Sequence, residues 1–132
     1  MRILILLLVC LVALILMAAA WQWHLMYFPT HHDRDNGLSE WRHGGALIGF
    51  AREVAAPKNV WLMLHGNGGQ ASDRAYALPS FSNLDSVFIL EYPGYGQRPG
   101  TPSRKTIDAA AKEAYRLLKS RFPATPLCVA GE

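Results

Sequence analysis

Three short apolar runs constrain the fold of this chain more than any other feature. They are Asn59–Leu64, Ser86–Leu90 and Leu127–Ala130. Each is apolar over most of its length, as a strand is when both faces of its sheet are covered. The intervening segments Gln70–Leu78 and Ser103–Phe122 are predicted to form helices, and the second repeats apolar residues at helical spacing. Strands that alternate with helices predict a parallel sheet with helices on its faces.

A pair of shorter β-like runs precedes the first of these strands. Trp41–His43 and Ala46–Ala51 are joined at Gly44–Gly45, which predicts an antiparallel hairpin at the edge of the sheet. The predicted fold class is therefore α/β, with an antiparallel edge hairpin, parallel strands and flanking helices. This domain is expected to span residues 41–132, after a polar linker over residues 22–40.

The amino terminus carries an uncharged apolar run, Ile3–Ala20, which is at the lower limit of what spans a bilayer. Arg2 is the only charged side chain before it, so we expect a cytoplasmic amino terminus and a domain on the outer, periplasmic or extracytoplasmic side. Residues 1–21 are either a signal anchor, with Trp21 at the membrane interface, or a signal peptide cleaved after Ala20, which would release a secreted domain. The very short segment before the run favours the anchor.

The linker and the overall charge exclude several classes of ligand. His31 and His32 are adjacent, so their side chains point apart on an extended chain, and no cysteine or third histidine is near in sequence. We expect a solvated, turn-rich linker over residues 31–37 and no metal site. The net charge of +3 comes from scattered residues, which argues against nucleic acid as a partner.

Each predicted strand is followed by a glycine-containing segment. These are His65–Gly69 (His-Gly-Asn-Gly-Gly), Glu91–Gly96 (Glu-Tyr-Pro-Gly-Tyr-Gly) and Gly131–Glu132. A dinucleotide-binding interpretation fails, because the third glycine, Gly100, comes one position too late. No phosphate-cradling Walker A sequence is present, so no cofactor is expected.

The order of these segments over residues 41–132 resembles the α/β-hydrolase superfamily, and closely the small membrane-anchored serine hydrolases within it. In that superfamily the strand corresponding to Leu127–Ala130 runs into a Gly-x-Ser-x-Gly elbow, of which Gly131–Glu132 supplies the first two letters. Tyr27–Pro29 (Tyr-Phe-Pro) also fits this group. The resemblance implies that the backbone N–H groups of Asn67 and, second, Gly68 stabilise the oxyanion.

The same resemblance assigns structural rather than chemical roles to other residues. The catalytic histidine of the superfamily follows the acid, which in turn follows the serine, so the earlier His65 is expected to hold the loop by hydrogen bonding. Glu91 is expected to orient loop residues. The residues expected to give structural support are His65, Gly66, Glu91, Gly94 and Gly131.

The function that the resemblance implies is that of the N-terminal part of a serine hydrolase acting on ester, thioester or amide bonds. Its substrate would be a small-molecule or lipid-like ester. The nucleophile, the acid and the catalytic histidine are expected beyond residue 132, so the chain as given is predicted to be inactive. The alternative is a non-catalytic, membrane-tethered α/β binding module or a pseudoenzyme. A coding sequence that continues past Glu132 with Ser-x-Gly would separate the two.

Overall fold

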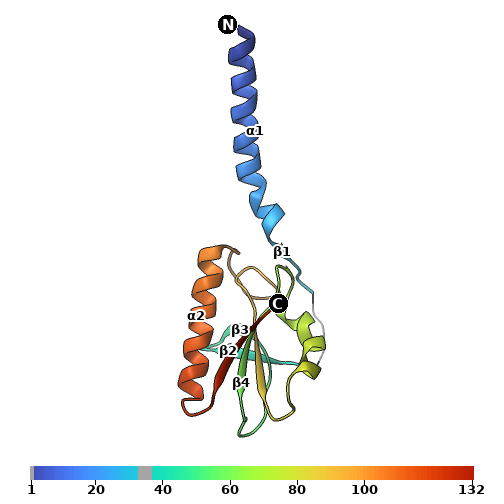
Figure 1. The fold of residues 1–132 in the computed structure, drawn as a ribbon, viewed down its shortest axis with the longest axis vertical. Coiled ribbons are helices and arrows are strands. Elements are labelled where there is room, and N and C mark those ends of the chain that lie inside the picture. The colour runs from blue at the N-terminus through green and yellow to red at the C-terminus, as the bar shows by residue number, and fades with distance from the viewer. Residues whose placement is uncertain (1, 33–36) are drawn as a thin grey trace.

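A long helix, α1 (Arg2–Met26), stands apart from an α/β domain (Figure 1). A computed structural model describes residues 2–32 and 37–132. The domain contains strands β1 (Phe28–Pro29), β2 (Ser39–His43), β3 (Ala46–Arg52), β4 (Val60–Leu64), β5 (Gly68–Gly69), β6 (Ser86–Leu90) and β7 (Leu127–Gly131), with helices η1 (Ala71–Ser80) and α2 (Arg104–Arg121).

The main sheet has five strands in the order β2-β3-β6-β4-β7. Strands β6, β4 and β7 run parallel, whereas β2 and β3 form an antiparallel hairpin at one edge. The predicted fold class is therefore confirmed. The register places Leu64 opposite both Leu90 and Gly131, so the three parallel strands end at the same level of the sheet. The segments that follow these strands are consequently brought to one edge.

Helix α2 covers one face of the sheet. Its buried residues Ala110, Ala114 and Leu118 belong to a core that includes Phe88 of β6. Ser103 caps the helix, because its hydroxyl oxygen accepts a hydrogen bond from the Thr106 N–H at 3.0 Å. The predicted limits Ser103–Phe122 are therefore the two capping residues of this helix.

The opposite face of the sheet is covered by η1, which differs in type from the helix expected there. Ala71 is fully buried with Met63, Val87 and Ile89 in a second apolar cluster. It is a 3₁₀ helix over Ala71–Ser80, close to the predicted limits Gln70–Leu78. The Glu91 carboxylate, from a distant part of the chain, accepts the first N–H of this helix, and a local capping pattern cannot reveal such a partner.

The segment expected to be a solvated linker is partly built into the domain. Helix α1 continues to Met26, and Phe28 and Pro29 then pair with Gly68 and Gly69 as β1 and β5. His32 keeps 38% of its side-chain surface exposed, but its Nε2 also lies 2.9 Å from Asp73 Oδ1. Residues 33–36 of the predicted turn-rich connector lie outside the described residues.

Helix α1 is long and apolar enough over Arg2–Gln22 to cross a membrane, and its apolar side chains are exposed. This confirms an N-terminal apolar helix and agrees with both an anchor and a signal sequence.

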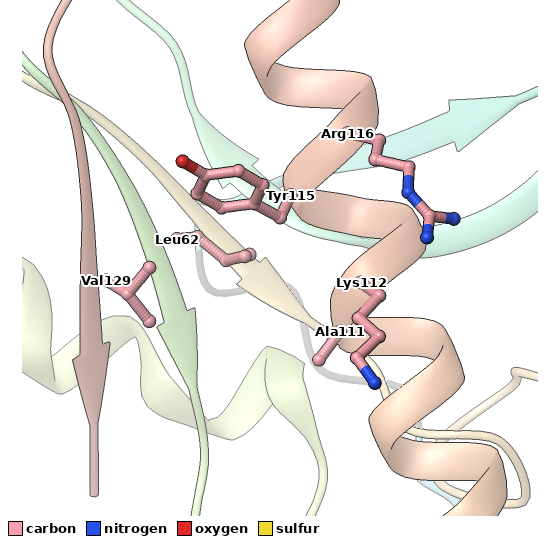
Figure 2. Close-up of a pocket in the computed structure, with 6 residues that line it drawn as sticks. All are labelled: Leu62, Ala111, Lys112, Tyr115, Arg116 and Val129. Atoms are coloured by element: carbon pink, nitrogen blue, oxygen red, sulfur yellow. The ribbon is translucent and has the colours of Figure 1, made fainter.

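The outer edge of the sheet at β7 carries an open apolar hollow. It is lined by Leu62 and Val129 of the sheet and by Ala111, Lys112, Tyr115 and Arg116 of α2. Figure 2 shows Tyr115 directed toward the strands, whereas Arg116 extends away from them. Val129 is 53% exposed, so this edge is only partly covered in the described part of the chain.

Candidate functional site

The candidate site lies at the carboxyl ends of β4, β6 and β7. The loop His65–Gly69 follows β4, the turn Glu91–Gly96 follows β6, and Glu132 follows β7. The Glu132 N–H donates to the Leu64 carbonyl at 3.1 Å, which fixes the end of β7 directly beside the start of the loop. In parallel α/β sheets this is the edge at which ligands bind.

His65 holds the loop from below. Its ring is fully buried and packs on Tyr92 with ring centroids 4.1 Å apart. Nδ1 lies 2.8 Å from the Gly66 carbonyl oxygen, and because that oxygen can only accept, Nδ1 must donate. A peptide unit is planar and trans, so fixing the Gly66 carbonyl also fixes the direction of the Asn67 N–H on the other side of the same unit.

Two buried tyrosines fix the neighbouring peptide units in the same way. The Tyr92 hydroxyl donates to the His65 carbonyl at 2.7 Å, and the Tyr95 hydroxyl lies 2.9 Å from the Asn67 carbonyl oxygen. The Gly66 N–H and the Gly68 N–H are therefore oriented by their own peptide planes. The loop's N–H groups are held in place before any ligand arrives.

Arg74 of η1 ties the loop to the end of β7, and sequence analysis did not single it out. Its guanidinium donates to the Gly68 carbonyl at 2.6 Å and to Glu132 Oε2 at 2.9 Å. Its side chain is only 10% exposed. In the sequence Arg74 is one of many scattered basic residues, so only the three-dimensional contacts reveal its position.

The Glu132 carboxylate lies over the start of the loop. It accepts hydrogen bonds from the Gly66 N–H at 2.8 Å, from Arg74, and from the Tyr76 hydroxyl at 2.7 Å. The Gly66 N–H and these side-chain donors lower the pKa of Glu132 to about 2. Its negative charge therefore persists at this edge through the acidic range.

Glu91 is fully buried beneath the loop. Its two carboxylate oxygens lie 3.0 and 3.1 Å from the Ala71 N–H, and Oε1 lies 3.4 Å from His65 Nε2 without forming a hydrogen bond. A Cβ on Gly96 would overlap Glu91 Oε2, so only glycine fits there. Gly94 turns the chain with φ of +82°, and the Glu91–Gly96 segment is thus folded back onto the loop.

Every residue expected at the site reaches this edge. His65, Gly66, Asn67 and Gly68 belong to the loop, and Glu91 lies beneath it. Gly94 lies in the adjoining turn, and Gly131 lies at the end of β7. Their assigned roles in chemistry stay predictions.

Because Tyr92 is buried beneath the loop, the stability of the fold is expected to fall at alkaline pH. Burial raises the pKa of Tyr92 to about 12, above its ordinary value of 10.0. A raised folded pKa means that the protonated phenol stabilises the fold at low pH, and that this contribution is lost as the pH rises from 10 toward 12. We expect the urea midpoint to fall between about pH 9 and about pH 11, and to fall less in Tyr92→Phe. An equal fall in both proteins would contradict this assignment.

The fold is that of a partial α/β-hydrolase domain. Three features define it: the sheet order, the hairpin at one edge, and the glycine-rich loop beside the end of β7. Comparison with known proteins supports this class, although no protein-family model matches the chain. The chain is 41% identical over 64 residues to the α/β hydrolase domain-containing protein aho-3 of Caenorhabditis elegans. This match covers 46% of this chain and 19% of that protein. It is 32% identical over 92 residues to the α/β hydrolase domain-containing protein 17C of Xenopus laevis, covering 65% of this chain and 29% of that protein.

A solved structure gives the same result for the fold. The crystal structure of TT1662 from Thermus thermophilus matches with a TM-score of 0.57 and 24% sequence identity, over 71% of this chain and 45% of that chain. The chain spans less than a third of the length of the curated relatives reported above. The resemblance to the α/β-hydrolase superfamily is confirmed.

Proposed function

We propose that this chain supplies the scaffold and half of the oxyanion hole of a serine hydrolase that acts on ester, thioester or amide bonds. One observation carries the proposal: the end of β7 lies directly beside the His65–Gly69 loop. Gly131 pairs with Leu64, and the Glu132 carboxylate accepts the Gly66 N–H. Since consecutive Cα atoms are about 3.8 Å apart, a serine directly after Glu132 would lie close to the next N–H groups of the loop.

The loop suits stabilisation of a tetrahedral oxyanion, which requires N–H donors that are already oriented. The Asn67 N–H is the first candidate donor and the Gly68 N–H the second. His65 holds the peptide unit of the first, and Tyr95 holds that of the second. The other oxyanion donor in this superfamily belongs to the residue after the nucleophile, and a later acid and histidine would activate the serine.

Hydrolysis of a nitrophenyl ester tests the proposal. We expect the natural protein, expressed with its whole coding sequence, to hydrolyse the ester and the 132-residue chain in detergent to show no rate above buffer. Activity of the 132-residue chain would overturn the expectation that its chemistry lies elsewhere. Absence of activity in the natural protein, tested against ester, thioester and amide substrates, would refute the hydrolase proposal.

Tyr95→Phe tests whether the loop is the oxyanion site. Loss of the hydroxyl removes the shorter of two hydrogen bonds to the Asn67 carbonyl and leaves only the one from the Phe28 N–H at 3.4 Å. The peptide unit that carries the Gly68 N–H is then held less firmly, so we expect kcat to fall by about tenfold with little change in KM, less than the loss of a whole donor. The matched control is Tyr115→Phe, because this partly exposed side chain of α2 lines the hollow at β7 rather than the candidate site. Equal activity in the two variants would argue against this loop.

A further inference from the structure

The end of α1 lies very close to the candidate site. Helix α1 ends at Met26, and Phe28 is already paired with Gly68. The Thr30 N–H donates to the Gly69 carbonyl at 3.1 Å, and the Thr30 carbonyl accepts the Gly96 N–H at 3.0 Å. The residues just after α1 therefore contact both loops of the site, and Figure 1 shows α1 leaving the domain at this end.

The connection between α1 and the loop is short. Two extended residues span at most about 7 Å, and neighbouring strands are about 4.8 Å apart. Gly68 is therefore within about 12 Å of Met26. Because β1 is hydrogen-bonded to the loop, the domain cannot turn the site away from α1 without breaking that pairing.

The length of α1 places its end at the membrane surface. A helix of 25 residues is about 37 Å long, which exceeds the hydrocarbon core of about 30 Å. The last turns then reach the headgroups, where Trp21 is exposed together with Leu25, Met26 and Phe28. The headgroup region would cover these apolar groups. Cleavage after Ala20 would leave them uncovered, so the geometry favours an uncleaved anchor.

We propose that the candidate site opens at the bilayer surface and takes amphiphilic acyl esters or thioesters that are themselves held in the bilayer. The inference rests on the proposed hydrolase function and adds where the substrate comes from. The reacting carbonyl would lie near headgroup level, within reach of the His65–Gly69 loop, on the outer side of the membrane. A substrate that already lies in the membrane needs only lateral diffusion to reach the loop.

The depth of the site can be measured without relying on activity. Tyr76 and Leu84 are each 65% exposed. The Tyr76 hydroxyl contacts Glu132 at the site, which is at the carboxyl ends of the parallel strands. Leu84 lies just before β6, at the opposite, amino-terminal ends of these strands. Each is changed to cysteine and labelled with a fluorophore, after Cys10 and Cys128 are changed to alanine. The natural protein is then reconstituted in phosphatidylcholine vesicles that carry a nitroxide quencher on their headgroups.

We expect quenching of the Tyr76→Cys label to be several-fold stronger than that of the Leu84→Cys label. Equal quenching, or stronger quenching at position 84, would overturn the proposal.

A flexible Gly-Ser insertion after Met26 tests the substrate class. It is expected to lower hydrolysis of a vesicle-embedded acyl ester several-fold while leaving hydrolysis of a water-soluble ester unchanged. Unchanged rates on both esters would overturn the inference alone. A parent protein that hydrolyses neither ester would overturn the proposed function, and the substrate class with it, so the two failures are distinguishable.

Discussion

Gly49→Ala is expected to lower the free energy of unfolding by more than about 3 kcal/mol. Gly49 lies in β3 opposite Leu90 of β6. A Cβ there would overlap the Ile89 carbonyl oxygen and lie 2.9 Å from the Glu91 N–H nitrogen. These are backbone atoms of the most buried strand, so they cannot move aside as a flexible side chain could. Urea unfolding of the natural protein, followed by circular dichroism, measures the change.

The matched control is Gly131→Ala in the same sheet. Among the described residues 2–32 and 37–132, no atom lies within 4 Å of a Cβ built on Gly131, so we expect a change within about 0.5 kcal/mol. Similar unfolding free energies for the two variants would contradict the predicted contact of β3 with β6. They would also remove the support for the sheet order on which the site depends.

Glu91→Ala is expected to cost about 2 to 4 kcal/mol of unfolding free energy and to abolish most hydrolase activity. The fully buried carboxylate is the acceptor for the Ala71 N–H at the start of η1. Its loss leaves that N–H buried without a partner and opens a cavity beneath His65 and Gly96. The loop would then lose the support that orients its N–H groups. Urea unfolding and ester hydrolysis measure the two effects.

Glu91→Gln separates the hydrogen bond from the charge. Glutamine keeps the volume and one oxygen acceptor for the Ala71 N–H, so we expect less than half of the loss caused by alanine. The amide could also donate to His65 Nε2, which forms no hydrogen bond in the described part of the chain. If glutamine is as damaging as alanine, the charge of Glu91 matters more than its role as an acceptor.

The main elements could be predicted from sequence because their signals are local. The apolar runs give β4, β6 and β7. The helical spacing between Pro102 and Pro123 gives α2, with its caps at Ser103 and Phe122. The order of glycine-containing segments after these strands then predicts which residues meet at one edge. Parallel strands in register are sufficient to bring them together.

The support of the site could not be predicted in the same way, because it depends on contacts between distant parts of the chain. Arg74 reaches Glu132 across 58 positions, and Tyr95 reaches Asn67 across 28. Strand β1 has only two residues and pairs with a loop, so no periodicity reveals it. His32 carried no signal that distinguished a contact with Asp73 from exposure to solvent.

The most direct test of the hydrolase account is to map a fluorophosphonate adduct by mass spectrometry on the natural protein. This reagent forms a covalent bond with an activated serine. We expect one adduct, on a serine that directly follows Glu132, and no adduct in Glu91→Ala. An adduct on a serine elsewhere, or no adduct on the folded protein, would contradict the assignment of the His65–Gly69 loop and the end of β7 as the active site.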